Sequence, residues 1–351
     1  MLELPVIRVA GTVTAMGHAY GRAVADLARA FVHERARAAR AYLYEKGIRD
    51  QGRLLELGRA CLARLADWDA EGHAEHLAVA AGAGIDAAEL YTAGNYTDLR
   101  DIIALGDDPA TEGCSTLLLP AGATGGPVVA GQTWDLNPGD LAFVVAVHRF
   151  PHASAPTFAI TCAGCPSLIG MNAHGLAVGT TNIKTRGARL GIPYLSLLHR
   201  LLRCHDRAEA RSVIEGAPLA AAHTYWAADA GGVEDWERTP FGFVHRAGNA
   251  PLFRTNHCLA AAHRHLEGEP PYASSRRRLA RLRVLAQRTR DAAGMRAVFA
   301  DRADGVDSIN RFPEDAQGTT TNACVITEPA RRRIHACRGP ADRGRWITVE
   351  F

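Results

Sequence analysis

The sequence lacks several features that would place it in a specialised class of protein. No apolar run reaches 18 residues, so we expect no transmembrane helix and no membrane partner. The first eight residues have no basic stretch followed by an apolar core and a small-residue cleavage site, which predicts no secretory signal peptide. The net charge is only +3, with an isoelectric point near 8.5, and gives no reason to expect nucleic acid as a partner. These absences favour a cytoplasmic globular protein.

Cysteine is present without a disulfide or metal-binding pattern. The eight cysteines are scattered along the chain. Cys162 and Cys165 have CxxC spacing, but no second such pair and no histidine pair follows at zinc-finger distance. We therefore expect reduced thiols and no metal site.

The chain also has no internal repeat, no low-complexity tract and no linker long enough to divide it. Its 351 residues are 47% hydrophobic and 22% charged, which is ordinary for a globular protein. We predict a single domain over residues 1–351. Its one basic cluster, Arg276 to Arg278 with Arg281 and Arg283, recurs at helical spacing and is interpreted as a solvated helix face.

The two parts of the chain differ in predicted secondary structure. The first 105 residues contain one strand, at 6–14, and are otherwise mostly helical, including a long helix that ends at Gly47. After Cys114, apolar β-branched runs predict a series of antiparallel strands. Later helices are expected at 192–216, 274–288 and 291–300. Helices outside stacked strands fit a layered α+β domain.

The most informative feature is the pair Gly113-Cys114. It stands between a polar, turn-rich approach at 106–109 and an apolar run at 115–120 that is typical of a buried strand. A cut between the two residues would give Cys114 both a thiol and a free α-amine. Their unperturbed pKa values, about 8.5 and about 7.7–8.0, allow the amine to take the thiol proton at neutral pH. Gly113 suits such a cut because it has no Cβ. The alternative is a buried cysteine that opens a core strand.

Further motifs follow in an order that resembles a known family. The segments are Gly113-Cys114-Ser115-Thr116, Gly131-Gln132-Thr133-Trp134-Asp135, Gly170-Met171-Asn172-Ala173-His174-Gly175-Leu176, Thr255-Asn256-His257, Ser274-Ser275-x-x-Arg278 and Ser308-Ile309-Asn310-Arg311. Upstream, Glu75-x-Leu77-Ala78-x-Ala80-Ala81-Gly82-Ala83 and Asn95 extend the resemblance to nearly the whole chain. They resemble the autoproteolytic acyltransferase/hydrolase family typified by isopenicillin-N acyltransferase, a branch of the cysteine N-terminal-nucleophile hydrolases.

This resemblance implies a fold and an activity. The fold would be a four-layer αββα sandwich, cut by the chain itself into a mostly helical α-chain (1–113) and a β-chain (114–351). The activity would be hydrolysis or acyl transfer on N-acyl or β-lactam-type small amides, through a thioester on Cys114. No cofactor is implied, and acyl-CoA would be a substrate if transfer occurs. The two fragments would stay associated, and assembly into a homo-oligomer is left open.

The resemblance also implies roles for single residues. Asp135 would hold the Cys114 α-amine, and Arg311 would balance Asp135 or a substrate carboxylate. Without the resemblance, these two would be a solvated aspartate and a surface salt bridge. Other candidates are Ser115 and Thr116 for self-cleavage, and Trp134, His223 and Asn256 for substrate contacts.

The chain departs from the family's pattern where an oxyanion-stabilising asparagine is expected on a strand. Thr224 stands at that place, so its hydroxyl, the backbone near Cys114, or the neighbouring His223 would have to donate. His223 and Thr224 should face opposite ways because strand residues alternate. His257 is interpreted as a structural histidine and not as a Cys–His base.

Two other functions remain as alternatives. One is a non-catalytic binding protein of the same fold that is never cut. The other is an amidase of the penicillin-V or bile-salt acylase type, whose cysteine lies close to the initiator methionine. Here 113 residues precede Cys114, which ranks this alternative lower.

Overall fold

The computed structural model describes residues 1–50, 52–104, 113–267, 273–315 and 318–351. The predicted turn-rich approach to the cleavage site, at 106–109, lies outside these residues.

The first sheet has eight strands in the order β1-β4-β5-β6-β7-β8-β9-β10. Its strands are β1 (Val6–Gly11), β4 (Val144–Pro151), β5 (Thr157–Cys162), β6 (Ile169–Asn172), β7 (Ala177–Asn182), β8 (His223–Asp229), β9 (Gly232–Thr239) and β10 (Gly242–Ala247). The pair β1–β4 is parallel and the remaining neighbours are antiparallel.

The second sheet has six antiparallel strands in the order β11-β2-β3-β12-β13-β14. Its strands are β2 (Gly113–Leu119), β3 (Val129–Leu136), β11 (Leu252–Arg254), β12 (Thr320–Glu328), β13 (Arg333–Arg338) and β14 (Ile347–Glu350). Strands β2 and β3, which carry the Gly-Cys pair and the Trp-Asp segment, are direct neighbours.

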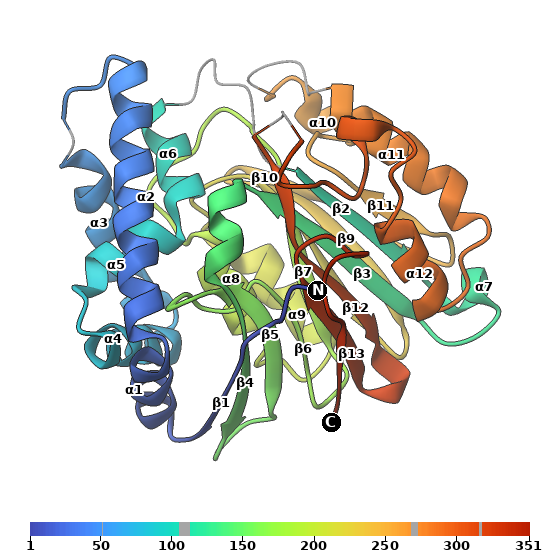
Figure 1. The fold of residues 1–351 in the computed structure, drawn as a ribbon, viewed down its shortest axis with the longest axis horizontal. Helices are drawn as coiled ribbons and strands as arrows, with labels where there is room; N and C mark the ends of the chain where they lie inside the picture. Colours follow the sequence, from blue (N-terminus) through green and yellow to red (C-terminus); the bar gives the residue numbers. More distant parts are fainter. Residues whose placement is uncertain (51, 105–112, 268–272, 316–317) are drawn as a thin grey trace.

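Helices cover the outer face of each sheet (Figure 1). On the side of the first sheet lie α1 (Val13–Ala23), α2 (Ala25–Glu45), α3 (Arg53–Trp68), α4 (Ala70–Ala83), α5 (Ala87–Gly94), α6 (Tyr96–Ala104), α8 (Tyr194–Leu201) and α9 (Arg207–Gly216). On the second sheet lie α11 (Ala273–Ala286) and α12 (Ala292–Phe299), and the short helices are α7 (Ala121–Thr124) and α10 (Ala261–Arg264).

The main core lies between the two sheets. Leu118 and Ala130 of the second sheet pack in one buried cluster with Ala146, Phe158 and Ile160 of the first. Burial of an apolar side chain of this size typically contributes about 1.5–3 kcal/mol, so the sheets are held face to face mainly by the hydrophobic effect. The predicted α+β, four-layer αββα sandwich is confirmed.

Helices α1 and α4 pack closely against each other at two glycines. An added Cβ at Gly21 of α1 would lie 2.1 Å from the Val79 oxygen of α4, and one at Gly82 of α4 would lie 2.3 Å from the His18 oxygen. The two helices therefore approach closely because glycines stand at their contact. The single helix predicted up to Gly47 is wrong, because Val24, with φ −116° and ψ 15°, leaves the helical region and separates α1 from α2.

Two further elements differ from expectation. The helices predicted over 192–216 are α8 and α9, with a break between them that the prediction did not locate, and Asp206 starts the second by accepting the Glu209 N–H. The three-residue strand β11 was not predicted, because its run is too short to show a period. It lies next to β2 and brings the following residues to Cys114.

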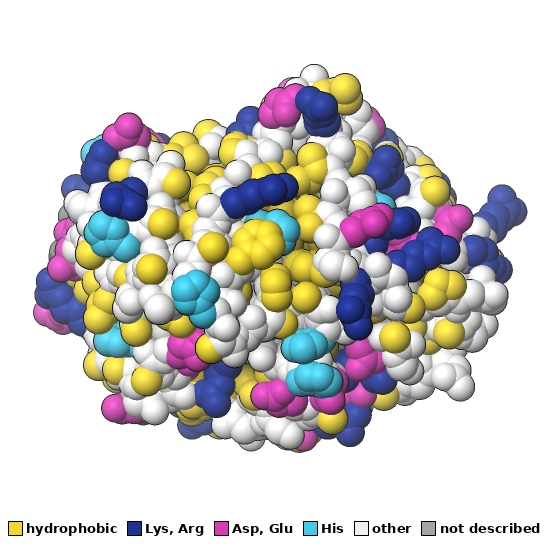
Figure 2. Space-filling view, turned by 90° about the horizontal axis from the view of Figure 1, so that it is seen from below, with side chains coloured by type: hydrophobic (Ala, Val, Ile, Leu, Met, Phe, Trp, Pro, Cys, Tyr) yellow, Lys and Arg dark blue, Asp and Glu magenta, His cyan; other side chains and the backbone are white. Residues whose placement is uncertain are grey.

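The surface carries charges of both signs. Figure 2 shows one face, on which Lys and Arg side chains are interspersed with Asp and Glu around hydrophobic side chains gathered near the centre. The large apolar side chains that are partly exposed in the structure include Val6 of β1 and Phe150 of β4.

Candidate active site

The Cys114 side chain points into the space between the two sheets. It belongs to the same buried cluster as Leu118, whereas Leu117 and Leu119 pack on the helices α11 and α12. Side chains of a strand alternate between faces, so Gly113 and Ser115 lie on the helix side. Trp134 of β3 stands directly opposite Cys114 in the ladder and therefore flanks it on the same face.

Gly113 lies against the buried ion pair of Asp135 and Arg311. In the β2–β3 ladder it stands opposite Asp135, whose Oδ2 lies 3.7 Å from the Arg311 Nε. A Cβ at position 113 would lie 2.8 Å from that same Oδ2 and 2.9 Å from the Arg311 Nη1. The peptide bond between Gly113 and Cys114 is thus placed beside the carboxylate of Asp135.

The Asp135 carboxylate is fully buried and short of donors. Among the described residues, neither of its oxygens has a hydrogen-bond partner. Burial raises the pKa of this carboxyl, and the charges of Arg311 and Arg278 only partly offset the rise. The hydroxyls of Thr133 and Thr321 lower the pKa somewhat, although both are outside hydrogen-bond geometry. A new cationic hydrogen-bond donor nearby would therefore stabilise the charged form of this carboxyl.

Gly113→Ala is expected to slow self-cleavage by roughly 10- to 100-fold, because a methyl group would collide with Asp135 and Arg311 and displace the scissile bond. The measurement is the time course of loss of the uncut chain on denaturing gels. Gly216→Ala is the matched control, since an added Cβ there meets nothing within 4 Å. If Gly113→Ala is cut at the wild-type rate, the packing argument fails.

Asn256 makes a direct contact with the backbone of Cys114. Its Oδ1 accepts the Cys114 N–H at 2.8 Å and the Arg278 Nη2–H at 3.0 Å. Its Nδ2 donates to the carbonyl oxygen of Asn182, at the end of β7, at 3.0 Å. An asparagine amide therefore contacts Cys114. It comes from position 256 and not from position 224, where the family resemblance led us to expect an asparagine.

Arg278 is the site residue that sequence reasoning missed. It was interpreted as part of a solvated helix face, but it is only 1% exposed, and that interpretation is wrong for this residue. Its Nη1 donates to the carbonyl oxygen of Cys114 and, at 3.2 Å, to the Ser115 Oγ. Burial lowers its pKa to about 9, which leaves it charged at neutral pH. Its place among five closely spaced arginines gave no sign of burial, and only the Ser-Ser-x-x-Arg motif gave a signal.

Thr224 and His223 face opposite sides of β8, as alternation predicts. The Thr224 hydroxyl bonds the hydroxyl of Thr181 and lies 3.3 Å from its carbonyl oxygen. The His223 Nε2 bonds Asp98 of α6 at 2.7 Å, and its ring stacks on Tyr194. His223 is thus directed into the helical layer and not toward Cys114.

The remaining predicted residues lie close to this centre. Ser115 donates its N–H to the Thr133 Oγ1 at 3.2 Å, and Thr116 is fully buried two residues after Cys114. His257 bonds the Ser275 Oγ at 2.7 Å, which fits a structural histidine. Arg311 is held in place by hydrogen bonds that it donates to the hydroxyls of Thr319, at 2.6 Å, and of Ser274.

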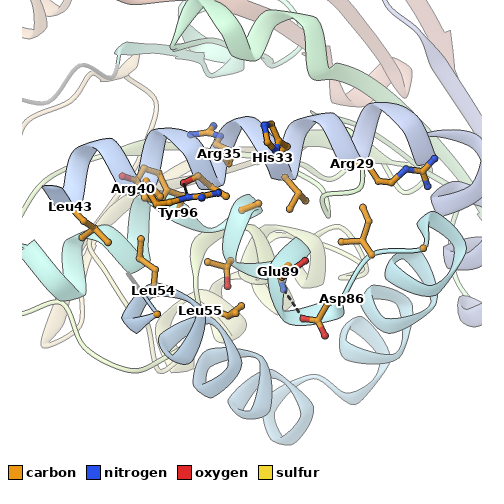
Figure 3. A pocket seen from close by; sticks show the side chains of 18 residues that line it. Arg29, His33, Arg35, Arg40, Leu43, Leu54, Leu55, Asp86, Glu89 and Tyr96 are labelled. Atoms are coloured by element: carbon orange, nitrogen blue, oxygen red, sulfur yellow. Dashed lines mark hydrogen bonds between the residues drawn. The ribbon is translucent and has the colours of Figure 1, made fainter. Parts of the chain in front are cut away.

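A separate cavity of about 680 Å³ lies in the helical layer between α2, α3 and α5 (Figure 3). Its floor is apolar, with Leu54 and Leu55 of α3, and Arg29 and Arg40 of α2 lie along one rim. All its lining residues precede Cys114 in the sequence, and none comes from β2 or β3.

Two features are absent from the described residues, a metal-binding cluster and a membrane-spanning helix. In the described ranges, no three His, Cys, Asp or Glu side chains are arranged to hold a metal ion. Within the same ranges, no helix combines the length and the apolar character needed to cross a bilayer.

Comparison with known proteins gives a family match over the larger part of the chain. The model of a family described as acyl-coenzyme A:6-aminopenicillanic acid acyl-transferase matches residues 123–342. No curated protein matches the sequence.

Solved structures give weaker likenesses. A mutant of the conjugated bile acid hydrolase from Clostridium perfringens is 11% identical, with a TM-score of 0.44 over 68% of this chain and 92% of that one. An N-acylethanolamine-hydrolyzing acid amidase ortholog from Caenorhabditis elegans is 14% identical, with a TM-score of 0.47 over 68% of this chain and 100% of that one. A penicillin V acylase from Agrobacterium tumefaciens is 12% identical, with a TM-score of 0.38 over 68% of this chain and 86% of that one.

Proposed function

Since the chain belongs to the acyl-coenzyme A:6-aminopenicillanic acid acyl-transferase family, we propose that Cys114 is the nucleophile of a self-processing enzyme that cleaves small amides. Family membership confirms the family predicted from the sequence and the predicted enzyme class, a hydrolase or acyltransferase acting on amide bonds. One observation supports the residue assignment most strongly. Cutting the Gly113–Cys114 bond would free an amine beside a buried carboxylate that lacks hydrogen-bond donors among the described residues.

Self-cleavage would proceed in two steps. The Cys114 thiol attacks the carbonyl carbon of Gly113, the C–N bond breaks, and the nitrogen takes up the thiol proton. Gly113 is then held as a thioester on Sγ, which water hydrolyses to a Gly113 carboxylate and a free thiol. The liberated α-amine of Cys114 donates a hydrogen bond to Asp135 and keeps its lone pair, so it can act as a base. Arg311, 3.7 Å from Asp135, balances the charge of the carboxylate in the uncut chain.

Turnover would use the same thiol with the new amine as its base. The amine removes the thiol proton, and the thiolate attacks the carbonyl of an N-acyl substrate. The resulting ammonium group returns the proton to the leaving amine, and the acyl group stays on Sγ as a thioester. Water completes hydrolysis, whereas a second amine would complete transfer, with acyl-CoA as an alternative acyl donor. Trp134, beside Cys114, would contact the acyl group.

The negative oxygen formed by this attack needs fixed donors, and the contacts favour Asn256 over Thr224. One N–H of the Asn256 amide is used by the Asn182 carbonyl, and the second is available for the oxyanion. The Thr224 hydroxyl is instead engaged with Thr181. Asn256, in the loop after β11, would thus supply the amide that the family resemblance led us to expect on β8.

Thr224→Val is expected to change kcat by less than about threefold, because its hydroxyl is not the donor. Asn256→Ala is expected to lower kcat by about 100-fold, the usual effect of removing one oxyanion-hole donor. Both are measured on protein whose cleavage has been verified. A 100-fold loss in Thr224→Val with little effect in Asn256→Ala would return the role to Thr224.

We also propose that the two fragments stay associated after the cut. Buried contacts join residues on either side of it: the ion pairs of Glu75 Oε1 with Arg149 Nε at 2.7 Å and of Arg35 with Asp140 at 3.2 Å, and the hydrogen bond between Asp98 and His223 at 2.7 Å. Although burial opposes it, the charge of Arg149 holds the pKa of Glu75 well below its usual range. Breaking such a buried pair typically costs about 3–5 kcal/mol, which opposes dissociation.

The substrate class is tested by trapping the thioester. Penicillin V, an N-acylethanolamine and an N-acyl amino acid are incubated with the processed protein, and the 238-residue fragment (351 − 113 = 238) is weighed by intact mass spectrometry. The expected result is an acyl adduct on Cys114 that hydroxylamine removes. Adding 6-aminopenicillanic acid distinguishes transfer from hydrolysis. An uncut chain that binds one of these compounds without an adduct would favour the non-catalytic binding protein.

The cytoplasm is proposed as the compartment. The eight cysteines all lie within the described residues and form no disulfide there, as expected where thiols are kept reduced.

A further inference from the structure

Asn256 lies on a segment that no strand ladder holds. Residues 255–260, between β11 and α10, belong to no helix or strand. Several of their backbone N–H groups donate to side chains, as when Leu259 donates to the Oε2 of the buried Glu237 at 2.7 Å. The position of Asn256 therefore depends on side chains from other elements.

The backbone of Asn256 is tied to Ser275, near the start of α11. The Asn256 N–H donates to the Ser275 Oγ at 2.9 Å, and that Oγ also lies 2.7 Å from the His257 Nδ1. The oxygen accepts the N–H and can at the same time donate its own proton to Nδ1, and in that arrangement Nδ1 is the acceptor. Ser275 is fully buried and His257 is 8% exposed, so water competes little with these bonds.

The direction of these bonds requires a neutral imidazole. Burial, together with the charges of Arg276 and Arg278, lowers the pKa of His257 to about 4, against the opposing charge of Glu237. At neutral pH the ring of His257 is therefore neutral, and the tautomer with its proton on Nε2 accepts at Nδ1. A protonated ring would turn a donor toward Ser275.

We propose that Ser275 and His257 are positioning residues of the amide-cleaving reaction: they hold the backbone of Asn256 so that its amide meets both Cys114 and the oxyanion. Neither side chain touches the reacting atoms. Arg278 and the Asn182 carbonyl hold the amide end of the side chain, and Ser275 holds the other end. The proposal rests on the proposed function, since it needs Asn256 to act on the acyl group.

The consequence is a rate effect without a binding effect. A displacement of about 1 Å in a reacting group can cost on the order of 100-fold in rate. Ser275→Ala and His257→Leu are therefore expected to lower kcat by roughly 10- to 100-fold, with KM changed by less than about threefold. His257→Asn, which keeps an acceptor near the place of Nδ1, is expected to restore most of the loss seen in His257→Leu.

The experiment measures acylation of Cys114 in the processed protein by p-nitrophenyl acetate, followed by the burst of nitrophenolate. Cys114→Ala gives the background from other thiols. The decisive comparison is Ser275→Ala made in wild type and in Asn256→Ala. A positioning role predicts a further loss below about threefold in the second background, because the group to be positioned is gone. A merely structural role predicts the same loss in both, in step with the melting temperature.

The outcomes separate the two proposals. If Asn256→Ala acylates at the wild-type rate, both the oxyanion role and the positioning role are overturned. If Asn256→Ala is slow but Ser275→Ala and His257→Leu are normal, only the positioning role is overturned. If Ser275→Ala does not fold, the pair His257→Leu and His257→Asn decides, and equal rates in the two would overturn the proposal.

Discussion

Replacing Cys114 by alanine is expected to give a single chain of 351 residues that is never cut and forms no acyl adduct. The thiol is both the group that attacks Gly113 and the group that carries the substrate acyl chain. Its removal should lower turnover by roughly 10,000-fold or more, as loss of a covalent nucleophile does elsewhere. Denaturing electrophoresis checks the first effect and intact mass the second.

Cys324→Ala is the matched control for this variant. Cys324 is also fully buried and lies on β12, but it packs against α12 and not in the space between the sheets. It should be cut at the wild-type rate. If Cys114→Ala is cut as efficiently as wild type, Cys114 is not the nucleophile of self-cleavage and the mechanism above is wrong.

Asp135→Asn is expected to lower both the rate of self-cleavage and the rate of Cys114 acylation by about 100- to 10,000-fold. The neutral amide would no longer attract the ammonium group formed at Cys114, so the amine–thiol pair would lose its orientation. The rates are measured on the same preparation, with acylation referred to the processed fraction. A change of less than about threefold would remove Asp135 from the site.

The same substitution should have the opposite effect on stability. A carboxyl whose pKa is raised by folding destabilises the protein as the pH rises from its unfolded value, about 3.9, through its folded value. In the uncut Cys114→Ala chain, Asp135→Asn is therefore expected to raise the melting temperature at pH 7 and to raise it less at pH 4. A lower melting temperature at pH 7 would show that Arg311 stabilises the charged carboxylate more than burial penalises it.

Much of the fold could be predicted because its signals are local. The β-branched runs after Cys114 and the capping residue Asp86, which accepts the Ala88 and Glu89 N–H groups, act within a few residues of one another. That Asp135 lies on a strand next to that of Cys114 was expected from two strand-like runs close together in the sequence, which form the neighbours β2 and β3. Such neighbours need no knowledge of distant elements.

The parts that could not be predicted depend on contacts between distant segments. Arg278 looks like its neighbours in the sequence, and only the packing of α11 on β2 buries it against Cys114. Asn256 reaches the same residue through β11, a strand too short to be recognised. The alternation of strand side chains correctly predicted that His223 and Thr224 face opposite ways. It could not predict which of the two faces the helical layer, because that depends on the contact of His223 with Asp98 of α6.

N-terminal sequencing of the larger fragment after expression tests the central claim most directly. Cleavage between Gly113 and Cys114 predicts two fragments, of 113 and 238 residues (351 − 113 = 238), and the larger one should read Cys-Ser-Thr-Leu. A different first residue, or a single uncut chain with full amide-cleaving activity, would contradict it.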